Sequence, residues 1–185
     1  MLYLITGGVR SGKSRYAEAL AEKLGEQTVL YIATLTADDD EMKRRIVRHR
    51  ATRPAAWRTA EAADNVATVL STAQEDVVLV DCLSGLVTNL VLAQEPAGEE
   101  AVIARVLEHV RELTAVITAT GKTVIVVSNE VGAGVVPAYP LGRWYRDALG
   151  LANQQLARAA SAVALVTVGI PQTLKGTFPE VNHDI

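Results

Sequence analysis

Residues 2–14 read Leu-Tyr-Leu-Ile-Thr-Gly-Gly-Val-Arg-Ser-Gly-Lys-Ser, and this stretch decides the fold. Its first five residues are apolar or β-branched, which predicts a buried strand. Residues 7–14 then follow the pattern Gly-x-x-x-x-Gly-Lys-Ser, and a run with helical spacing, Lys13 to Leu24, follows directly. A strand, this loop and a helix in that order are typical of a phosphate-binding P-loop, whereas a glycine turn with a chance lysine lacks that context.

The residue types of the loop suit the phosphates of ATP or GTP. Glycines lack a β-carbon, so the backbone can curl until its N–H groups point inward at phosphate oxygens. Lys13 is expected to bridge the β- and γ-phosphates, and the Ser14 hydroxyl to hold Mg²⁺. The sequence therefore predicts a nucleotide site formed by Gly7, Gly8, Val9, Arg10, Ser11, Gly12, Lys13 and Ser14.

Further apolar runs alternate with segments of helical spacing along the 185 residues. Strands are expected at 2–6, 29–33, 77–81, 123–128 and 163–168, and helices at 13–24, 39–50, 64–72, 99–119 and 145–160. The alternation predicts an α/β fold with a mostly parallel central sheet flanked by helices, in one domain spanning residues 1–185. The loop 94–98 and the tail 176–185 are the candidate flexible pieces.

Polar residues follow several of these predicted strands, at the edge where a parallel sheet binds its ligands. Asp81 comes after four aliphatic residues and is expected to hold the metal with Ser14, although it could instead cap the next helix. Cys82 is expected to be a small core residue rather than a nucleophile. Asn129 and Glu130 are candidates for orienting water or substrate.

Composition excludes several classes of protein. The single cysteine cannot form an internal disulfide, no signal peptide is recognisable, and no apolar stretch is long enough to span a bilayer, so a cytoplasmic protein without a membrane span is expected. The net charge of −3 and the scarcity of aromatic residues argue against nucleic acid as a partner. The basic run from Lys43 to Arg58 nevertheless leaves a RecA-like nucleic-acid motor as an alternative.

The segment 39–50 places acids at the start of a predicted helix and arginines near its end, which complements the helix dipole. His49 falls between an apolar stripe and a basic one. A basic neighbourhood should lower the pKa of this imidazole and keep it neutral and nucleophilic, although position alone favours an ordinary surface or core histidine. Trp57 could equally pack in the core or line a base-binding loop.

Nine segments, taken together, resemble the bifunctional adenosylcobinamide kinase / adenosylcobinamide-phosphate guanylyltransferase family of cobalamin biosynthesis. The resemblance covers nearly the whole chain in order. It is carried by Gly-Gly-Val-Arg-Ser-Gly-Lys-Ser-Arg (7–15), Tyr-Ile-Ala-Thr (31–34), Asp-Asp-Glu-Met (39–42), Arg-Ile-x-x-His-Arg (45–50), Arg-Pro-x-x-Trp-Arg-Thr-x-Glu (53–61), Val-Asp-Cys-Leu-Ser (80–84), Thr-Asn-Leu (88–90), Ser-Asn-Glu-Val-Gly-x-Gly-x-Val-Pro (128–137) and Arg-Asp-x-x-Gly-x-x-Asn-Gln (146–154).

The resemblance implies a RecA-like P-loop fold, a homotrimer, and two activities. Adenosylcobinamide is phosphorylated, with GTP or ATP as donor, and GMP is then transferred from GTP to adenosylcobinamide phosphate through a covalent GMP–histidine intermediate. That intermediate would form on His49, so the resemblance favours the nucleophilic interpretation. Beyond the P-loop and Asp81, the implied nucleotide contacts are Ala33, Thr34, Leu35, Arg50, Ala51, Thr52, Arg53 and Glu61.

The remaining histidines and one alternative bear on the role of His49. The other histidines of the chain, His109 and His183, lie outside the matching segments and are expected to face solvent. A simple kinase in which His49 only packs remains the alternative to the bifunctional enzyme.

Overall fold

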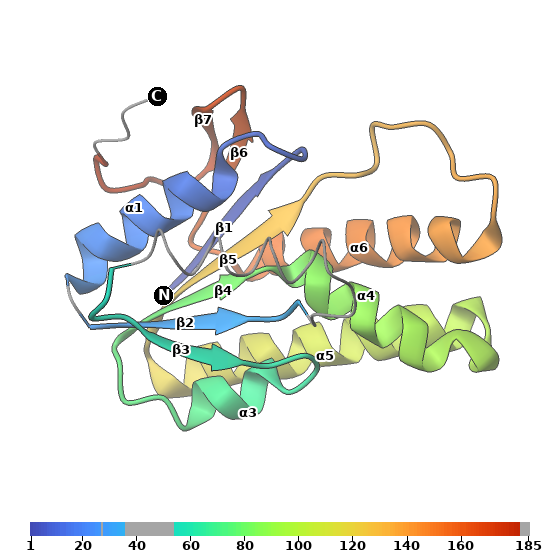
Figure 1. Ribbon diagram of the computed structural model, residues 1–185, viewed down its shortest axis with the longest axis horizontal. Coiled ribbons are helices and arrows are strands. Elements are labelled where there is room, and N and C mark those ends of the chain that lie inside the picture. Colours follow the sequence, from blue (N-terminus) through green and yellow to red (C-terminus); the bar gives the residue numbers. More distant parts are fainter. Residues whose placement is uncertain (27, 36–53, 182–185) are drawn as a thin grey trace.

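The computed structural model describes residues 1–26, 28–35 and 54–181, and this part of the chain is built around one seven-stranded sheet (Figure 1). The strand order is β3-β2-β4-β5-β1-β6-β7, and every pair is parallel except the last, in which β7 runs antiparallel to β6. The predicted mostly parallel sheet is confirmed. The strands are β1 (Leu2–Gly7), β2 (Val29–Ala33), β3 (Arg58–Glu61), β4 (Val77–Asp81), β5 (Thr123–Asn129), β6 (Ala162–Thr167) and β7 (Ile170–Lys175).

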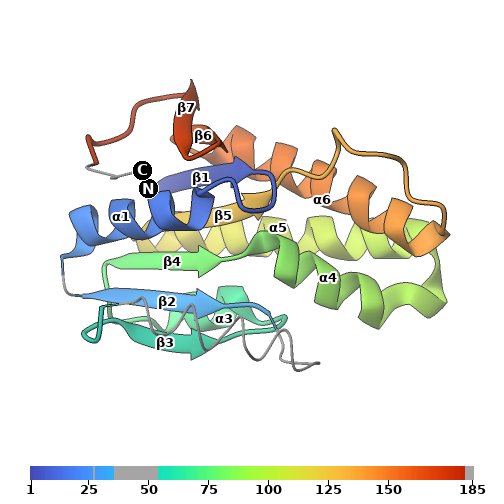
Figure 2. The same ribbon diagram turned by 45° about the horizontal axis from the view of Figure 1, so that its top comes forward.

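Helices cover both faces of the sheet, with α1 on one face and the other four helices of the described residues on the opposite face (Figure 2). A short 3₁₀ turn, η1 (Glu95–Ala97), lies between α4 (Leu83–Gln94) and α5 (Glu99–Thr120). None of the helices in the described part of the chain is long and apolar enough to cross a membrane. The helices are α1 (Lys13–Gly25), α3 (Val66–Ser71), α4 (Leu83–Gln94), α5 (Glu99–Thr120) and α6 (Pro140–Ala159).

Alternation along the strands divides the interior into two cores. Leu4 and Val80 face the core beneath α3 to α6, whereas Ile5 and Leu79 face the core beneath α1. All four side chains are at most 1% exposed. Because successive strand residues point to opposite faces, a strand buried on both sides appears as the continuous apolar run seen in the sequence.

The structure differs from the expected elements in four places. β3, β7 and α4 are regular elements that the sequence patterns do not predict, and α6 begins at Pro140 rather than at residue 145. Proline suits the first turn of a helix because its missing N–H would have no partner there. The predicted helix 39–50 lies outside the described residues.

Candidate nucleotide-binding site

The loop at residues 7–14 joins the end of β1 to the start of α1, as predicted. Gly12 precedes the helix with φ 94°, in the left-handed region that favours glycine. No side chain among the described residues caps α1, so the backbone N–H groups of its first turn remain for a ligand. A helix start of this kind binds phosphate, since the N–H groups and the positive end of the helix dipole both favour an anion.

Lys13 stands at the first position of α1 and is only 8% exposed. Its Nζ donates a hydrogen bond to the carbonyl oxygen of Gly8 at 3.2 Å. This bond holds the ammonium group against the loop that it is predicted to serve. The side chain of Ser11 in the same loop is buried, and its hydroxyl has no hydrogen-bond partner in the described part of the chain.

Asp81 ends β4 and accepts a hydrogen bond from the hydroxyl of Tyr31 at 2.7 Å through Oδ2. The carboxylate does not cap α4, because the N-cap position is Cys82 and carries no side-chain cap. Strand pairing aligns Asp81 with Ala33 of β2, and Ala33 in turn with Glu61 of β3. Three predicted site residues thus form one row across the carboxyl edge of the sheet.

The predicted metal position has few protein donors. Among the described residues, no three His, Cys, Asp or Glu side chains converge on a common point. Mg²⁺ is commonly held by one or two protein groups together with phosphates and water, so a serine hydroxyl and one carboxylate suffice. The Tyr31 bond engages Oδ2 of Asp81 and not Oδ1, and the residues present fit such an ion.

Thr34 and Leu35 follow β2, and Thr34 serves mainly to fix this edge. Its hydroxyl donates to the carbonyl oxygen of Cys82 at 2.6 Å and accepts from the Cys82 N–H at 3.0 Å. Its carbonyl oxygen accepts from Nδ2 of Asn89 at 2.9 Å. With a side chain only 1% exposed, Thr34 positions its neighbours in the row rather than presenting a free hydroxyl.

A buried polar cluster lies beside Asp81, and the sequence did not predict it as a unit. Ser84 Oγ accepts a hydrogen bond from Nδ2 of Asn129 at 3.1 Å and lies 2.8 Å from the sulfur of Cys82. Burial raises the pKa of the Cys82 thiol, and the nearby Asp81 charge raises it further, which agrees with an inert core cysteine. Burial also raises the pKa of Tyr145, although hydrogen bonds with Thr88 and Ser84 offset part of that effect.

Asn129 connects this cluster to the phosphate loop. Strand register pairs it with Gly7, and the N–H of Glu130 donates to the Gly7 carbonyl at 3.0 Å. Asn153 of α6 donates to the backbone oxygen of Asn129 at 3.1 Å. The side-chain Oδ1 of Asn129 is buried and has no partner among the described residues. An unused hydrogen-bond acceptor therefore lies beside the phosphate loop.

The remaining residues singled out in the sequence are either outside the described ranges or away from the phosphate loop. His49, Arg50, Ala51, Thr52 and Arg53 fall outside the described residues. Trp57 is 7% exposed and packs in the core beneath α1, which supports the core interpretation for this residue. Arg58, at the end of the basic run, pairs with Glu75 through two hydrogen bonds of 2.6 and 2.9 Å.

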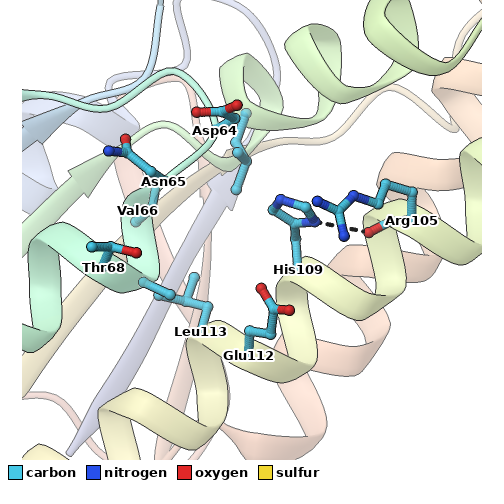
Figure 3. Close-up of a pocket in the computed structure, with 10 residues that line it drawn as sticks. Asp64, Asn65, Val66, Thr68, Arg105, His109, Glu112 and Leu113 are labelled. Carbon is cyan, nitrogen blue, oxygen red and sulfur yellow. Dashed lines mark hydrogen bonds between the residues drawn. The ribbon is translucent and has the colours of Figure 1, made fainter.

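His109 lies in a separate pocket of about 240 Å³ between α5 and the start of α3 (Figure 3). Its Nδ1 lies 3.1 Å from the carbonyl oxygen of Arg105. The pocket is formed by α3, α4 and α5 and contains neither the P-loop nor Asp81. His109 is half-buried rather than fully solvent-facing, which departs from the expectation for this residue.

Comparison with known proteins extends these observations. The sequence model of one family, described as cobinamide kinase / cobinamide phosphate guanyltransferase, matches residues 3–174. The bifunctional adenosylcobalamin biosynthesis protein CobU of Salmonella typhimurium is 42% identical over 95% of this chain and 100% of its own length. The bifunctional adenosylcobalamin biosynthesis protein CobP of Pseudomonas aeruginosa is 44% identical over 94% of this chain and 96% of its own.

Similarity to solved structures concerns the fold alone. The solved structure of an ATPase domain superposes with a TM-score of 0.52 at 14% identity, covering 89% of this chain and 68% of that one. Similarity to an ATPase domain agrees with the RecA-like P-loop fold that the family resemblance implies.

Proposed function

This chain belongs to the cobinamide kinase / cobinamide phosphate guanyltransferase family, and we propose that it catalyses both reactions around the single phosphate loop at residues 7–14. In the first, the γ-phosphoryl group of ATP or GTP passes to the aminopropanol hydroxyl of adenosylcobinamide. In the second, GMP from GTP joins the new phosphate, pyrophosphate leaves, and adenosylcobinamide-GDP forms.

One observation carries the proposal. An uncapped helix start and a nearly buried lysine follow β1, and a carboxylate ends β4, two strands away at the same carboxyl edge of the sheet. Phosphoryl transfer depends on positioning and charge stabilisation rather than on covalent protein chemistry, and these groups supply both.

In the kinase step, Lys13 would neutralise charge that develops on the transferred phosphoryl group. Ser14 and Asp81 would hold Mg²⁺, which when bound would supply further positive charge to the phosphates. Asn129 is the candidate for positioning the acceptor, because its Oδ1 lacks a partner among the described residues and a hydroxyl can donate to it. That bond would orient the attacking oxygen toward the γ-phosphorus.

In the guanylyl step, we propose that neutral His49 attacks the α-phosphorus of GTP. A phosphorus–nitrogen bond forms as the bond to pyrophosphate breaks. A phosphate oxygen of adenosylcobinamide phosphate then attacks the same phosphorus and releases His49. Arg45, Arg48 and Arg50 would balance the charge of the departing pyrophosphate. Glu61, in the row with Asp81, would contribute to binding the nucleoside.

The remaining parts of the proposal rest on the family. We propose that the protein is a cytoplasmic homotrimer. Its substrates would be adenosylcobinamide and adenosylcobinamide phosphate, together with GTP or ATP. Sedimentation velocity of the purified protein tests the trimer, and a monomeric species at micromolar concentration would contradict it.

The covalent intermediate is the sharpest test. The protein is incubated with α-labelled GTP and Mg²⁺, and label that survives denaturing electrophoresis is measured. We expect the label to resist base and to be lost in acid, as a phosphoramidate is, and to be absent from His49→Ala. His109→Ala is the matched control because His109 lies in the separate pocket, and it should label normally. Labelled His49→Ala protein would contradict the assignment of His49.

A further inference from the structure

The turn between β6 and β7 holds an exposed valine in an unusual backbone conformation. Val168 has φ 48° and Gly169 has φ 86°, so both central residues of the turn lie in the left-handed region. A β-branched residue is a rare occupant of that region, where glycine or asparagine is easily accommodated. The Val168 side chain is nevertheless 78% exposed, so burial within this chain does not explain its presence.

This turn is bonded to the phosphate loop. The N–H of Gly169 donates to the Ser11 carbonyl at 2.8 Å, and a β-carbon on Gly12 would lie 3.1 Å from the Gly169 Cα. This contact is tighter than usual for a β-carbon, and together with the left-handed φ of 94° it favours glycine at position 12. The position of Val168 is therefore fixed relative to the loop that would hold the phosphates.

The order of the strands indicates on which side of β1 the nucleoside of a bound nucleotide would lie. Asp81 and Asn129 end β4 and β5 on one side of β1, whereas β6 and β7 lie on its other side (Figure 2). A donor whose γ-phosphate points toward Asp81 and Asn129 has its α-phosphate and nucleoside at the opposite end of the phosphate chain. In the kinase step the nucleoside would therefore leave the loop toward the β6–β7 turn.

We propose that Val168 is an apolar contact for the purine base of the nucleotide that donates the γ-phosphoryl group. The two methyl groups of valine can pack on the face of a purine, and they carry no hydrogen-bonding groups that would distinguish adenine from guanine. The same position would thus accept ATP and GTP. This proposal rests on the proposed kinase function and gives its donor a base-binding residue.

The proposal also separates the two reactions in space. Ala33 and Glu61, proposed for the guanine nucleotide of the guanylyl step, end β2 and β3, which lie on the Asp81 side of β1. The γ-phosphoryl donor would lie toward β6 and β7, and the guanylyl donor toward β2 and β3. The Val168 contact belongs only to the former.

The test measures binding without a corrinoid, so it does not depend on either reaction. Titration calorimetry compares Val168→Gly with the unaltered protein for two ligands, the β,γ-imido analogue of ATP with Mg²⁺ and inorganic tripolyphosphate with Mg²⁺. Glycine suits the backbone of this turn, so the variant should fold. We expect the Kd of the ATP analogue to rise about five- to tenfold, as for loss of one apolar contact, and that of tripolyphosphate to stay unchanged.

Two further variants complete the design. Val168→Leu keeps an apolar side chain and should bind the analogue within about twofold of the unaltered protein. Leu174→Ala, a change at another exposed apolar residue near the far end of β7, should have no effect. Covalent labelling of Val168→Gly by α-labelled GTP should be unchanged.

Three outcomes would overturn the proposal: an unchanged Kd for the ATP analogue, an equal loss for tripolyphosphate, or a parallel loss of covalent labelling. The second would show that the turn only shapes the phosphate loop. Failure of cobinamide phosphorylation with the expected binding pattern intact would instead contradict the proposed kinase activity, so the two ideas fail separately.

Discussion

The two sides of the phosphate loop are built differently. On the side of β4 and β5, the Asp81 side chain is hydrogen-bonded to Tyr31, and beside it Asn129 is hydrogen-bonded to Ser84. On the side of β6 and β7, one backbone hydrogen bond fixes a turn whose side chain points into solvent. Chemistry at phosphorus needs side chains held in one position, whereas a base-binding contact needs only a correctly placed apolar surface. The difference suggests that reaction and donor binding are divided between the two sides.

The largest expected loss of activity comes from changing Lys13, which lies between the two sides of the phosphate loop. Lys13→Ala should lower kcat/KM on the order of 10²–10³-fold, because it removes a positioned charge from the reacting phosphates. Both the kinase and the guanylyl reaction should suffer if one loop serves both. Lys23→Ala, at the exposed end of the same helix, is the control. Retention of the full kinase rate in Lys13→Ala would show that the kinase site lies elsewhere.

A smaller effect is expected within the buried cluster. Asn129→Ala should lower kcat for cobinamide phosphorylation by about 10- to 100-fold, with little change in the KM for ATP, if Oδ1 orients the acceptor.

Ser128→Ala is the matched control for this substitution. Ser128 lies on the same strand, and its hydroxyl donates to Oδ1 of Asn153 at 2.6 Å. Its loss should destabilise the fold by about 1 kcal/mol, as for a buried hydrogen bond, without slowing phosphorylation. Equal kinetic losses in the two variants would mean that Asn129 acts only through folding.

The smallest effect is expected far from both sides. At the opposite edge of the sheet, Arg58 lowers the pKa of Glu75 from 4.5 to about 2, chiefly by hydrogen bonding. A lowered carboxyl pKa stabilises the fold above pH 4.5, and that contribution is lost as the pH falls toward 2. Glu75→Gln should cost about 1 kcal/mol or less at pH 7, since the Arg58 side chain is 51% exposed and solvent screens the pair.

Urea unfolding at pH 7, 4 and 2.5 measures this contribution. The difference between Glu75→Gln and the unaltered protein should shrink toward the lowest pH, while nucleotide affinity at pH 7 stays unchanged. Glu108→Gln, in the solvent-exposed Arg105–Glu108 pair, should show no measurable difference at any pH. A nucleotide affinity that depends on Glu75 would contradict the separation of the two edges.

The sequence was most informative where the signal is local. The P-loop occupies consecutive residues, and buried parallel strands are continuous apolar runs, so both could be predicted. α4 was missed because Leu83, Ser84, Leu86, Val87 and Leu90 are all buried, which leaves no polar face to show a helical period. β3 and β7 are polar edge strands whose identity depends on pairing with a neighbour.

The site shows the same limit. Asp81 could be predicted from its place after four aliphatic residues, but the Tyr31–Asp81 bond joins residues 50 positions apart, and no periodicity predicts it. The same holds for Asn129 and Ser84, which are 45 positions apart. The polar residues at single strand ends were thus predictable, whereas the contacts between strands depend on sheet order and register.

Cys82 can report on local opening at the carboxyl edge of the sheet, next to Asp81. It is the chain's single cysteine, and its raised pKa and burial keep the thiol unreactive while the edge is closed. A thiol reagent can therefore modify the protein only when the segment between Asp81 and Ser84 opens. The rate of that modification measures how often this segment opens. A bound nucleotide that stabilises the closed segment will lower the rate.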